Sequence, residues 1–264
     1  MISDELLLYK ELVEFCNGHV QQIDSNFIRH LEFTPFHEEC YEKMFFNNRH
    51  VNEPPTVQEL KTLIPSLAEA YKNAAAHYLN PRNRYIKGLD VQLGQWYEKA
   101  LKLFLATKGF KVLKKGFPFP DLEVRNTADN LLAYFELKYI GSPFFYANRQ
   151  IKNTYPYKSS RFDYEASLTL DTGEKMKKQR KKMQELEDRG IPVHFIWWFD
   201  CFHIKGIFAM TAHDVYDFYD HVGDNLHERK TREGDNETHQ EIGKIYPPLL
   251  EMTTFSEYLA MLNS

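Results

Sequence analysis

Two acidic residues and a lysine in neighbouring predicted strands are the residues of this chain best suited to chemistry. Asp121 follows Pro120 at the start of one strand-like stretch, and Glu136 and Lys138 lie within a second, at residues 131–140. Because side chains alternate along a strand, Glu136 and Lys138 should point to the same face. Two carboxylates and an ammonium group that converge in apolar surroundings are costly unless they hold a cation. A metal-dependent phosphodiester hydrolase needs this arrangement.

Each of these residues also has an ordinary structural interpretation. Asp121 could cap a turn after Pro120, and Glu136 and Lys138 could form a weak ion pair on a solvent-facing strand. The strongly apolar flanks of Glu136 favour the chemical interpretation instead. Glu123 shares a face with Asp121 and is interpreted as a surface acid.

The elements that would position these residues follow one another in a simple order. Apolar spacing predicts a helix over about 88–108, with Gly109 placed to end it. Strands are predicted at 110–114, 121–124 and 131–140, a strongly basic helix at 174–189, and further strands at 192–199 and 203–210. The stretch 192–199 is apolar throughout, as in a strand buried on both faces. A helical crossover places it beside the earlier strands, which predicts an α+β fold with an α/β core.

The two ends of the chain have a different character. Residues 4–16 and 19–32 have helix-like apolar spacing, and two prolines at 54–55 interrupt the chain. We therefore expect an acidic, helical N-terminal lobe over 1–80 and a catalytic domain over 81–264, with the boundary near 80–83. Helices are expected over 211–219 and from the capping-box pattern at Thr254, and a polar loop over 222–244.

Charge is distributed unevenly along the 264 residues, whose net charge is -4. Residues 82–184 hold 21 lysines and arginines against 10 acidic residues, while residues 1–81 hold 6 against 12 and residues 185–264 hold 6 against 15. A basic centre between acidic ends fits a chain that lays one face on a polyanion. Chance clustering on solvated helix faces would give the same pattern, so charge alone favours nucleic acid only modestly.

Composition argues against several classes of protein. No run of about eighteen apolar residues is present, so no membrane span is expected, and the acidic N-terminus lacks the features of a secretory signal. Cys16, Cys40 and Cys201 are odd in number and far apart, which favours reduced thiols and a cytoplasmic location. The chain lacks helicase and ATPase motifs, so no nucleotide cofactor is expected.

The residues Pro120-Asp121 and Glu136-Leu137-Lys138, in this order of elements, resemble the PD-(D/E)XK nuclease superfamily, which includes type II restriction endonucleases and DNA repair nucleases. The resemblance covers roughly residues 88–200. It implies a restriction-endonuclease-like mixed sheet flanked by helices. Glu98 matches an acidic residue that many members carry on the helix before the sheet, and Gln179 loosely matches a glutamine on the second core helix.

The resemblance also implies a role for each residue of the motif. Asp121, Glu136 and the carbonyl of Leu137 would hold Mg2+, with waters and the substrate phosphate completing the shell. Lys138 would position the attacking water and counter the charge that develops on phosphorus, leaving a 5′-phosphate. Glu98 would hold a water network or a second metal, although a helix here also needs polar residues that face water.

Candidate DNA contacts come from the segment 141–173 and from the basic helix. The segment mixes aromatic and polar residues without helical or strand periodicity, which indicates a functional loop, although packing over the sheet is an equal alternative. Arginine, asparagine and glutamine can read base edges, and lysine contacts phosphates. The candidate residues are Asn148, Arg149, Gln150, Lys152, Asn153, Lys158 and Arg161 in the segment, and Lys178, Gln179 and Lys182 on the helix.

Two Cys and His pairs have zinc-like spacing, Cys16 with His19 and His37 with Cys40. The first pair lies at a helix break and the second lacks the usual turn glycine, so zinc is not favoured. The histidines near the C-terminus are expected at the surface.

The leading hypothesis is a Mg2+-dependent endonuclease for double-stranded DNA, of the type II restriction kind. Cutting two strands favours a homodimer, and the N-terminal lobe could supply the dimer contact or clasp DNA. A repair or structure-specific nuclease with the same site is one alternative. A non-catalytic DNA-binding protein on a decayed nuclease scaffold is another, although the complete acid, acid and lysine set argues against decay.

Overall fold

An open six-stranded sheet organises the molecule, a computed structural model that describes residues 4–43, 62–67, 69, 89–115, 119–141, 168–171, 174–201, 205–222, 227–228, 242–245, 247, 249 and 252–263. The strand order is β1-β2-β3-β5-β6-β9. Strands β3 and β5 run parallel, and the other neighbouring pairs of this sheet are antiparallel. The strand bounds are β1 Lys111–Lys114, β2 Leu122–Arg125, β3 Leu131–Ile140, β5 Val193–Asp200, β6 Lys205–Thr211 and β9 Thr253–Thr254.

The predicted order of core elements is confirmed. Helix α6 (Leu89–Thr107) precedes the β1-β2-β3 meander, and helix α8 (Glu174–Glu187) lies between β3 and β5 in the chain. Parallel strands need such a crossover, whereas antiparallel strands can be joined by a short hairpin. Strand β5 is buried along its whole length, as its continuous apolar sequence predicts. The chain therefore has an α+β fold built on a mixed sheet.

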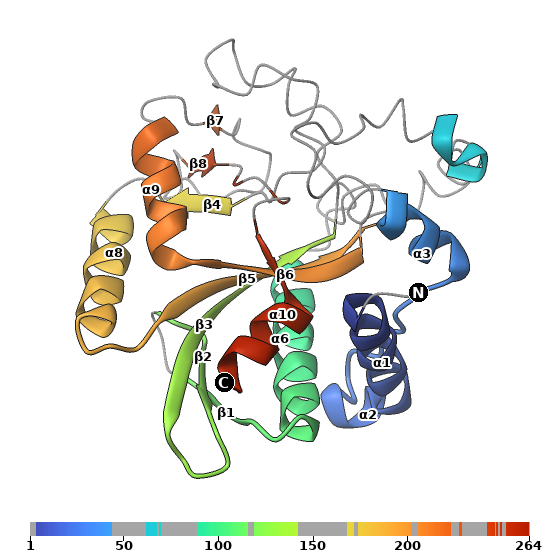
Figure 1. Ribbon diagram of the computed structural model, residues 1–264, viewed down its shortest axis with the longest axis horizontal. Coiled ribbons are helices and arrows are strands. Elements are labelled where there is room, and N and C mark those ends of the chain that lie inside the picture. The colour runs from blue at the N-terminus through green and yellow to red at the C-terminus, as the bar shows by residue number, and fades with distance from the viewer. Residues whose placement is uncertain are drawn as a thin grey trace.

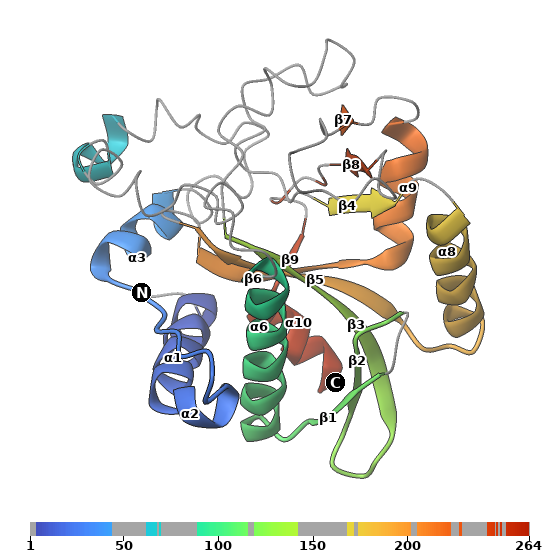
Figure 2. The same cartoon turned by 180° about the vertical axis from the view of Figure 1, so that it is seen from behind.

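Helices cover both faces of the sheet, as Figures 1 and 2 show. Helices α1 (Asp4–Gly18), α6 and α10 (Phe255–Leu262) pack on one face, against Phe135, Ile196 and Trp198. Helices α8 and α9 (Ala212–Val222) cover the other face, against Phe195 and Trp197. Successive residues of β5 therefore alternate between two separate cores, as the period of a strand requires.

The N-terminal helices belong to the core of the sheet rather than to a separate lobe. Tyr9 of α1 donates a hydrogen bond to the carbonyl of Phe199 (3.3 Å) and accepts one from the indole of Trp198 (3.2 Å). The predicted helix over 19–32 is wrong beyond α2 (Val20–Ile23), and a further helix, α3, spans Pro35–Tyr41. In this segment Leu31 is buried in the core on one face of the sheet and Phe27 and Phe33 pack against that core, all from irregular backbone, while Ile28 is exposed. The predicted boundary near 80–83 lies outside the described residues.

A buried ion cluster fixes this irregular segment to the sheet. Asp200 at the end of β5 lies 2.5 Å from both Lys205 of β6 and Arg29, and it also accepts a hydrogen bond from Tyr97 of α6. These partners hold the pKa of Asp200 well below its ordinary value despite its burial, which acts in the opposite direction. A buried carboxylate is tolerated only with such compensation, so the cluster links the N-terminal segment, α6 and the sheet.

A second sheet of three strands has the order β4-β8-β7, with bounds Leu168–Asp171, Ile242–Ile245 and His227–Glu228. Two predictions therefore need correction. The segment 141–173 was expected to lack strands, yet its last part forms β4, and the polar stretch 222–244 contributes β7 and part of β8. Pairing with a distant strand stabilises these short stretches, and periodicity within either segment alone does not reveal that pairing.

Candidate active site

The sheet register brings Asp121, Glu136 and Lys138 to one place. Leu122 pairs with Phe135 across β2 and β3, so Asp121, one residue before Leu122, lies opposite Glu136. Glu136 and Lys138 sit two residues apart on β3 and therefore point to the same face, which is the face covered by α8 and α9. The expected convergence of the three side chains is present.

Two hydrogen bonds fix the arrangement. The ammonium group of Lys138 donates to Oε1 of Glu136 at 2.6 Å, and the backbone N–H of Leu137 donates to Oδ2 of Asp121 at 3.0 Å. The Glu136 side chain is 8% exposed and that of Lys138 is 31% exposed, so solvent reaches the lysine more than the acid. The site opens on the lysine side, with the glutamate at its base.

The site holds two neighbouring carboxylates, Asp121 and Glu136, beside one cation, Lys138. Burial raises the pKa of Glu136, and the neighbouring charge of Asp121 raises it further, while the charge of Lys138 acts in the opposite direction without cancelling the rise. Burial alone would lower the pKa of Lys138, but the charge and hydrogen bond of Glu136 outweigh it, and the pKa of Lys138 is raised. One lysine therefore does not satisfy both acids.

The second oxygen of Glu136, Oε2, is buried and has no hydrogen-bond partner among the described residues. A buried carboxylate oxygen without a partner carries a large desolvation penalty, and a bound cation would remove it. Mg2+ prefers oxygen ligands and commonly takes one or two carboxylates, with waters and substrate phosphate filling its other positions. Asp121 and Glu136 fit that donor set.

The backbone of Leu137 can add one more oxygen. In an antiparallel pair the N–H and C=O of one residue point to the same edge of a strand. Because the Leu137 N–H reaches Asp121, its carbonyl also points toward the side of β2. No group of three or more His, Cys, Asp and Glu side chains suited to a metal occurs among the described residues. Asp121, Glu136 and this carbonyl could together supply three oxygen ligands.

Glu98 does not join the other three residues in any described contact. It lies on α6, which packs on the opposite face of the sheet, and forms an ion pair with Lys114 at 2.9 Å. The expected role of Glu98 in a water network or second metal site therefore gains no support from its position. The helical period in the sequence shows on which side of α6 Glu98 lies. It does not show which face of the sheet the helix covers.

Glu123 also differs from its expected place at the surface. The residue is 7% exposed and contacts Arg125 at 2.5 Å and Lys115 at 3.6 Å. The two cations compensate its burial, so Glu123 has a structural role in β2.

The candidate DNA contacts are placed only in part. Lys178 and Lys182 are exposed on α8, and Gln179 is half-buried between them, on the side of the helix that also carries buried Met183. Figure 1 shows α8 and α9 on the same side of β5. The register pairs Glu136 with Phe195 and Lys138 with Trp197, which lie in the core on that side. The residues Asn148, Arg149, Gln150, Lys152, Asn153, Lys158 and Arg161 lie outside the described residues.

The zinc-like pairs have other partners. His19 bonds the carbonyl of Phe15 at 2.8 Å and stacks on its ring, and His37 completes the capping box of α3 through Thr34. Cys16 and Cys40 are buried free thiols whose pKa burial raises to about 12, so neither is a ready thiolate ligand.

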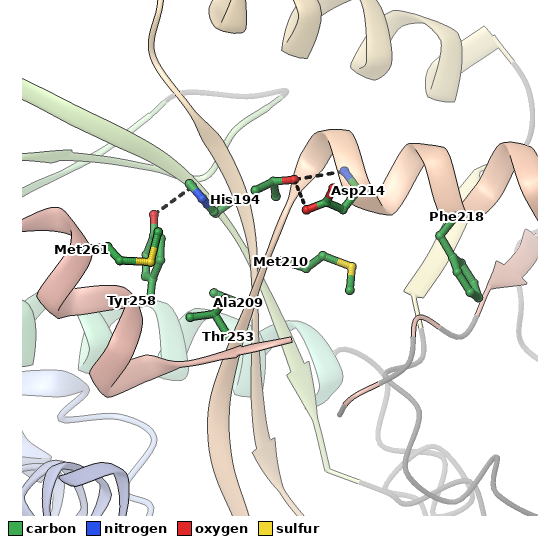
Figure 3. Close-up of a pocket in the computed structure, with 9 residues that line it drawn as sticks. His194, Ala209, Met210, Asp214, Phe218, Thr253, Tyr258 and Met261 are labelled. Atoms are coloured by element: carbon green, nitrogen blue, oxygen red, sulfur yellow. Dashed lines mark hydrogen bonds between the residues drawn. The ribbon is translucent and has the colours of Figure 1, made fainter. Parts of the chain in front are cut away.

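A separate cavity of about 250 Å³ lies where β6, α9 and α10 meet. Figure 3 shows His194 and Tyr258 pointing toward each other, with Asp214 near the start of α9. The imidazole of His194 and the hydroxyl of Tyr258 are 2.8 Å apart, and Asp214 bonds Thr211. His194 and Tyr258 are thus partners of each other, and Asp214 is a partner of Thr211, so these polar groups already have hydrogen bonds within the protein.

Replacing His194 by glutamine should reduce the acid sensitivity of the fold. Burial lowers the pKa of His194 to about 4, against a weaker opposing effect of Asp214. The unfolded chain takes up the proton near pH 6.5, so the stabilisation is complete above that pH and is lost as pH falls toward 4, by about 3 kcal/mol in total. Urea unfolding at about pH 7 and about pH 4.5 measures this difference. His213→Gln, at an exposed position of α9, is the control, and equal pH dependence in all three proteins would contradict the prediction.

Comparison with known proteins does not identify this chain: no family model, no curated protein and no solved structure matches it. None of the described helices combines the length and apolar character that a membrane crossing needs.

Proposed function

We propose that this protein is a Mg2+-dependent endonuclease of the PD-(D/E)XK type, acting on double-stranded DNA, and most specifically a type II restriction endonuclease. The observation that carries the proposal is the pair of facing carboxylates, Asp121 and Glu136, with Lys138 bonded to one oxygen of Glu136 and the other oxygen buried without a described partner. The order α6-β1-β2-β3-α8-β5 supports the same superfamily.

Each residue has a defined task in this reaction. Asp121, Glu136 and the Leu137 carbonyl would hold Mg2+, which when bound would supply Lewis-acid polarisation of the scissile phosphate. The backbone N–H of Leu137 fixes the orientation of Asp121 before metal arrives. The ammonium group of Lys138 holds the attacking water in line and offsets negative charge that grows on the phosphate oxygens. Hydrolysis by this route leaves a 5′-phosphate.

The surroundings of the site suit a DNA substrate. The exposed lysines of α8 lie on the face of the sheet that carries Lys138, where they can contact phosphates on either side of the cut. Cutting both strands requires two copies of the site, and a homodimer supplies them.

Plasmid cleavage tests the proposal. Supercoiled plasmid is incubated with the protein and Mg2+, with EDTA as the metal-free control and Glu136→Gln as the matched inactive variant. Discrete fragments from the wild type alone support restriction. A smear, or cleavage confined to branched DNA, supports a repair nuclease instead. Intact plasmid together with retained DNA binding would identify a non-catalytic DNA-binding protein and overturn the proposal.

A further inference from the structure

Tyr216 of α9 lies over the same face of the sheet as the candidate site. Its ring packs edge-on against Phe195, with ring centroids 6.3 Å apart, and Phe195 is the residue of β5 that pairs with Glu136 in the sheet register. The guanidinium group of Arg180 on α8 lies 5.3 Å from the centroid of the Tyr216 ring and also forms an ion pair with Asp220. The phenol is thus held from two sides, beside the strand position of Glu136.

The hydroxyl of Tyr216 is buried and, like Oε2 of Glu136, has no hydrogen-bond partner among the described residues. Buried polar atoms in native proteins are rarely left unpaired, so two on one face, one a donor and one an acceptor, call for a common explanation. The indole N–H of Trp197 is a third such atom, and Trp197 pairs with Lys138 in the register. Tyr216 and Trp197 therefore bring two unpaired donors to the face of the sheet that carries the unpaired oxygen of Glu136.

We propose that Tyr216 is a positioning residue for the metal site: its hydroxyl donates to a bridging water that in turn donates to Oε2 of Glu136, and this link fixes the orientation of that carboxylate. This inference rests on the proposed function. Partners that hydrogen-bond a metal-binding carboxylate orient it, and their removal typically weakens metal affinity about 10- to 100-fold. In this arrangement a residue of α9 orients a metal ligand on β3 without contacting the substrate.

If Tyr216 had only a structural role, replacing it by phenylalanine would leave the affinity for metal unchanged. The contacts with Phe195 and Arg180 involve the ring alone, and phenylalanine retains both. Removing an unpaired buried hydroxyl leaves a fold unchanged or makes it more stable. Loss of metal affinity without loss of stability therefore separates positioning from packing.

The test compares Tyr216→Phe with Tyr219→Phe, a half-buried tyrosine one turn away on the same helix. Binding of Mn2+ to the DNA-free protein is measured by electron paramagnetic resonance, and cleavage rate is measured against Mg2+ concentration. Tyr216→Phe should bind Mn2+ about tenfold or more weakly and need correspondingly more Mg2+, while its rate at saturating Mg2+ changes less. Its urea unfolding midpoint should match or exceed that of wild type, and Tyr219→Phe should bind metal normally.

The outcomes distinguish the two proposals. A wild type that neither binds Mn2+ nor cleaves DNA removes the metal site itself and this inference with it. A wild type that binds metal, with Tyr216→Phe binding it equally well, overturns the positioning role alone. A Tyr216→Phe protein whose lost affinity is accompanied by a lower urea midpoint shows that the tyrosine acts through packing, which also overturns it.

Discussion

Replacing Asp121 by asparagine should abolish Mg2+-dependent DNA cleavage, with a rate loss of at least about a thousandfold. A metal ion contributes several kcal/mol of transition-state stabilisation, and each 1.36 kcal/mol corresponds to about a factor of ten. Asparagine has nearly the same shape as aspartate, and its amide oxygen can still accept the 3.0 Å hydrogen bond from Leu137. The substitution therefore removes the negative charge that the proposed metal site needs and leaves the local backbone in place.

Asp129→Asn is the matched control for this experiment. Asp129 lies on the hairpin between β2 and β3 and has a positive φ of 67°, a conformation that asparagine adopts readily. It pairs with Lys111 at an exposed position. Plasmid cleavage and Mn2+ binding are measured for both variants and for wild type. Cleavage by Asp121→Asn at more than about a tenth of the wild-type rate would show that Asp121 does not hold the metal.

The alternation of strand residues made the centre of the site predictable. Glu136 and Lys138 share a face because the period of a strand is two, and this holds for any sheet that contains the strand. The proximity of Asp121 required in addition that β2 and β3 be neighbours, which short connections in a meander favour. The structure confirms both geometric steps through the register and the hydrogen bonds. The chemical roles remain predictions.

The sequence was less informative wherever packing between distant segments decides the outcome. The helical period of α6 identifies its buried stripe but not the face of the sheet that receives it, and Glu98 was assigned to the site on resemblance alone. The N-terminal segment was interpreted as a lobe, whereas Arg29 and Tyr9 attach it to β5 across more than a hundred and seventy residues of chain. Such contacts leave no periodic signal.

Tyr216 shows the same limit at the scale of one residue. In the sequence it is one aromatic residue in the apolar stripe of a short helix, where an aromatic side chain is usually buried. It becomes a candidate only in the folded structure, where its ring packs against Phe195, the residue that pairs with Glu136 in the sheet register. An unpaired polar atom is a property of the folded state, because it depends on what surrounds the atom after packing.

Replacing Lys138 by methionine should reduce the cleavage rate about 100- to 1000-fold while metal binding is largely retained, the loss typical for removing one preorganised donor from a transition state. Methionine preserves most of the buried aliphatic stem and removes only the charge. Glu136 then loses the partner at 2.6 Å that lowers its pKa, so the raised pKa should rise further and the acid limb of the pH–rate profile should move to higher pH. Lys111→Met, at an exposed ion pair with Asp129, is the control. The prediction is that the cleavage rate falls much more than the affinity for Mn2+. If Lys138→Met loses Mn2+ affinity in proportion to its loss of rate, Lys138 supports Glu136 rather than positioning the attacking water.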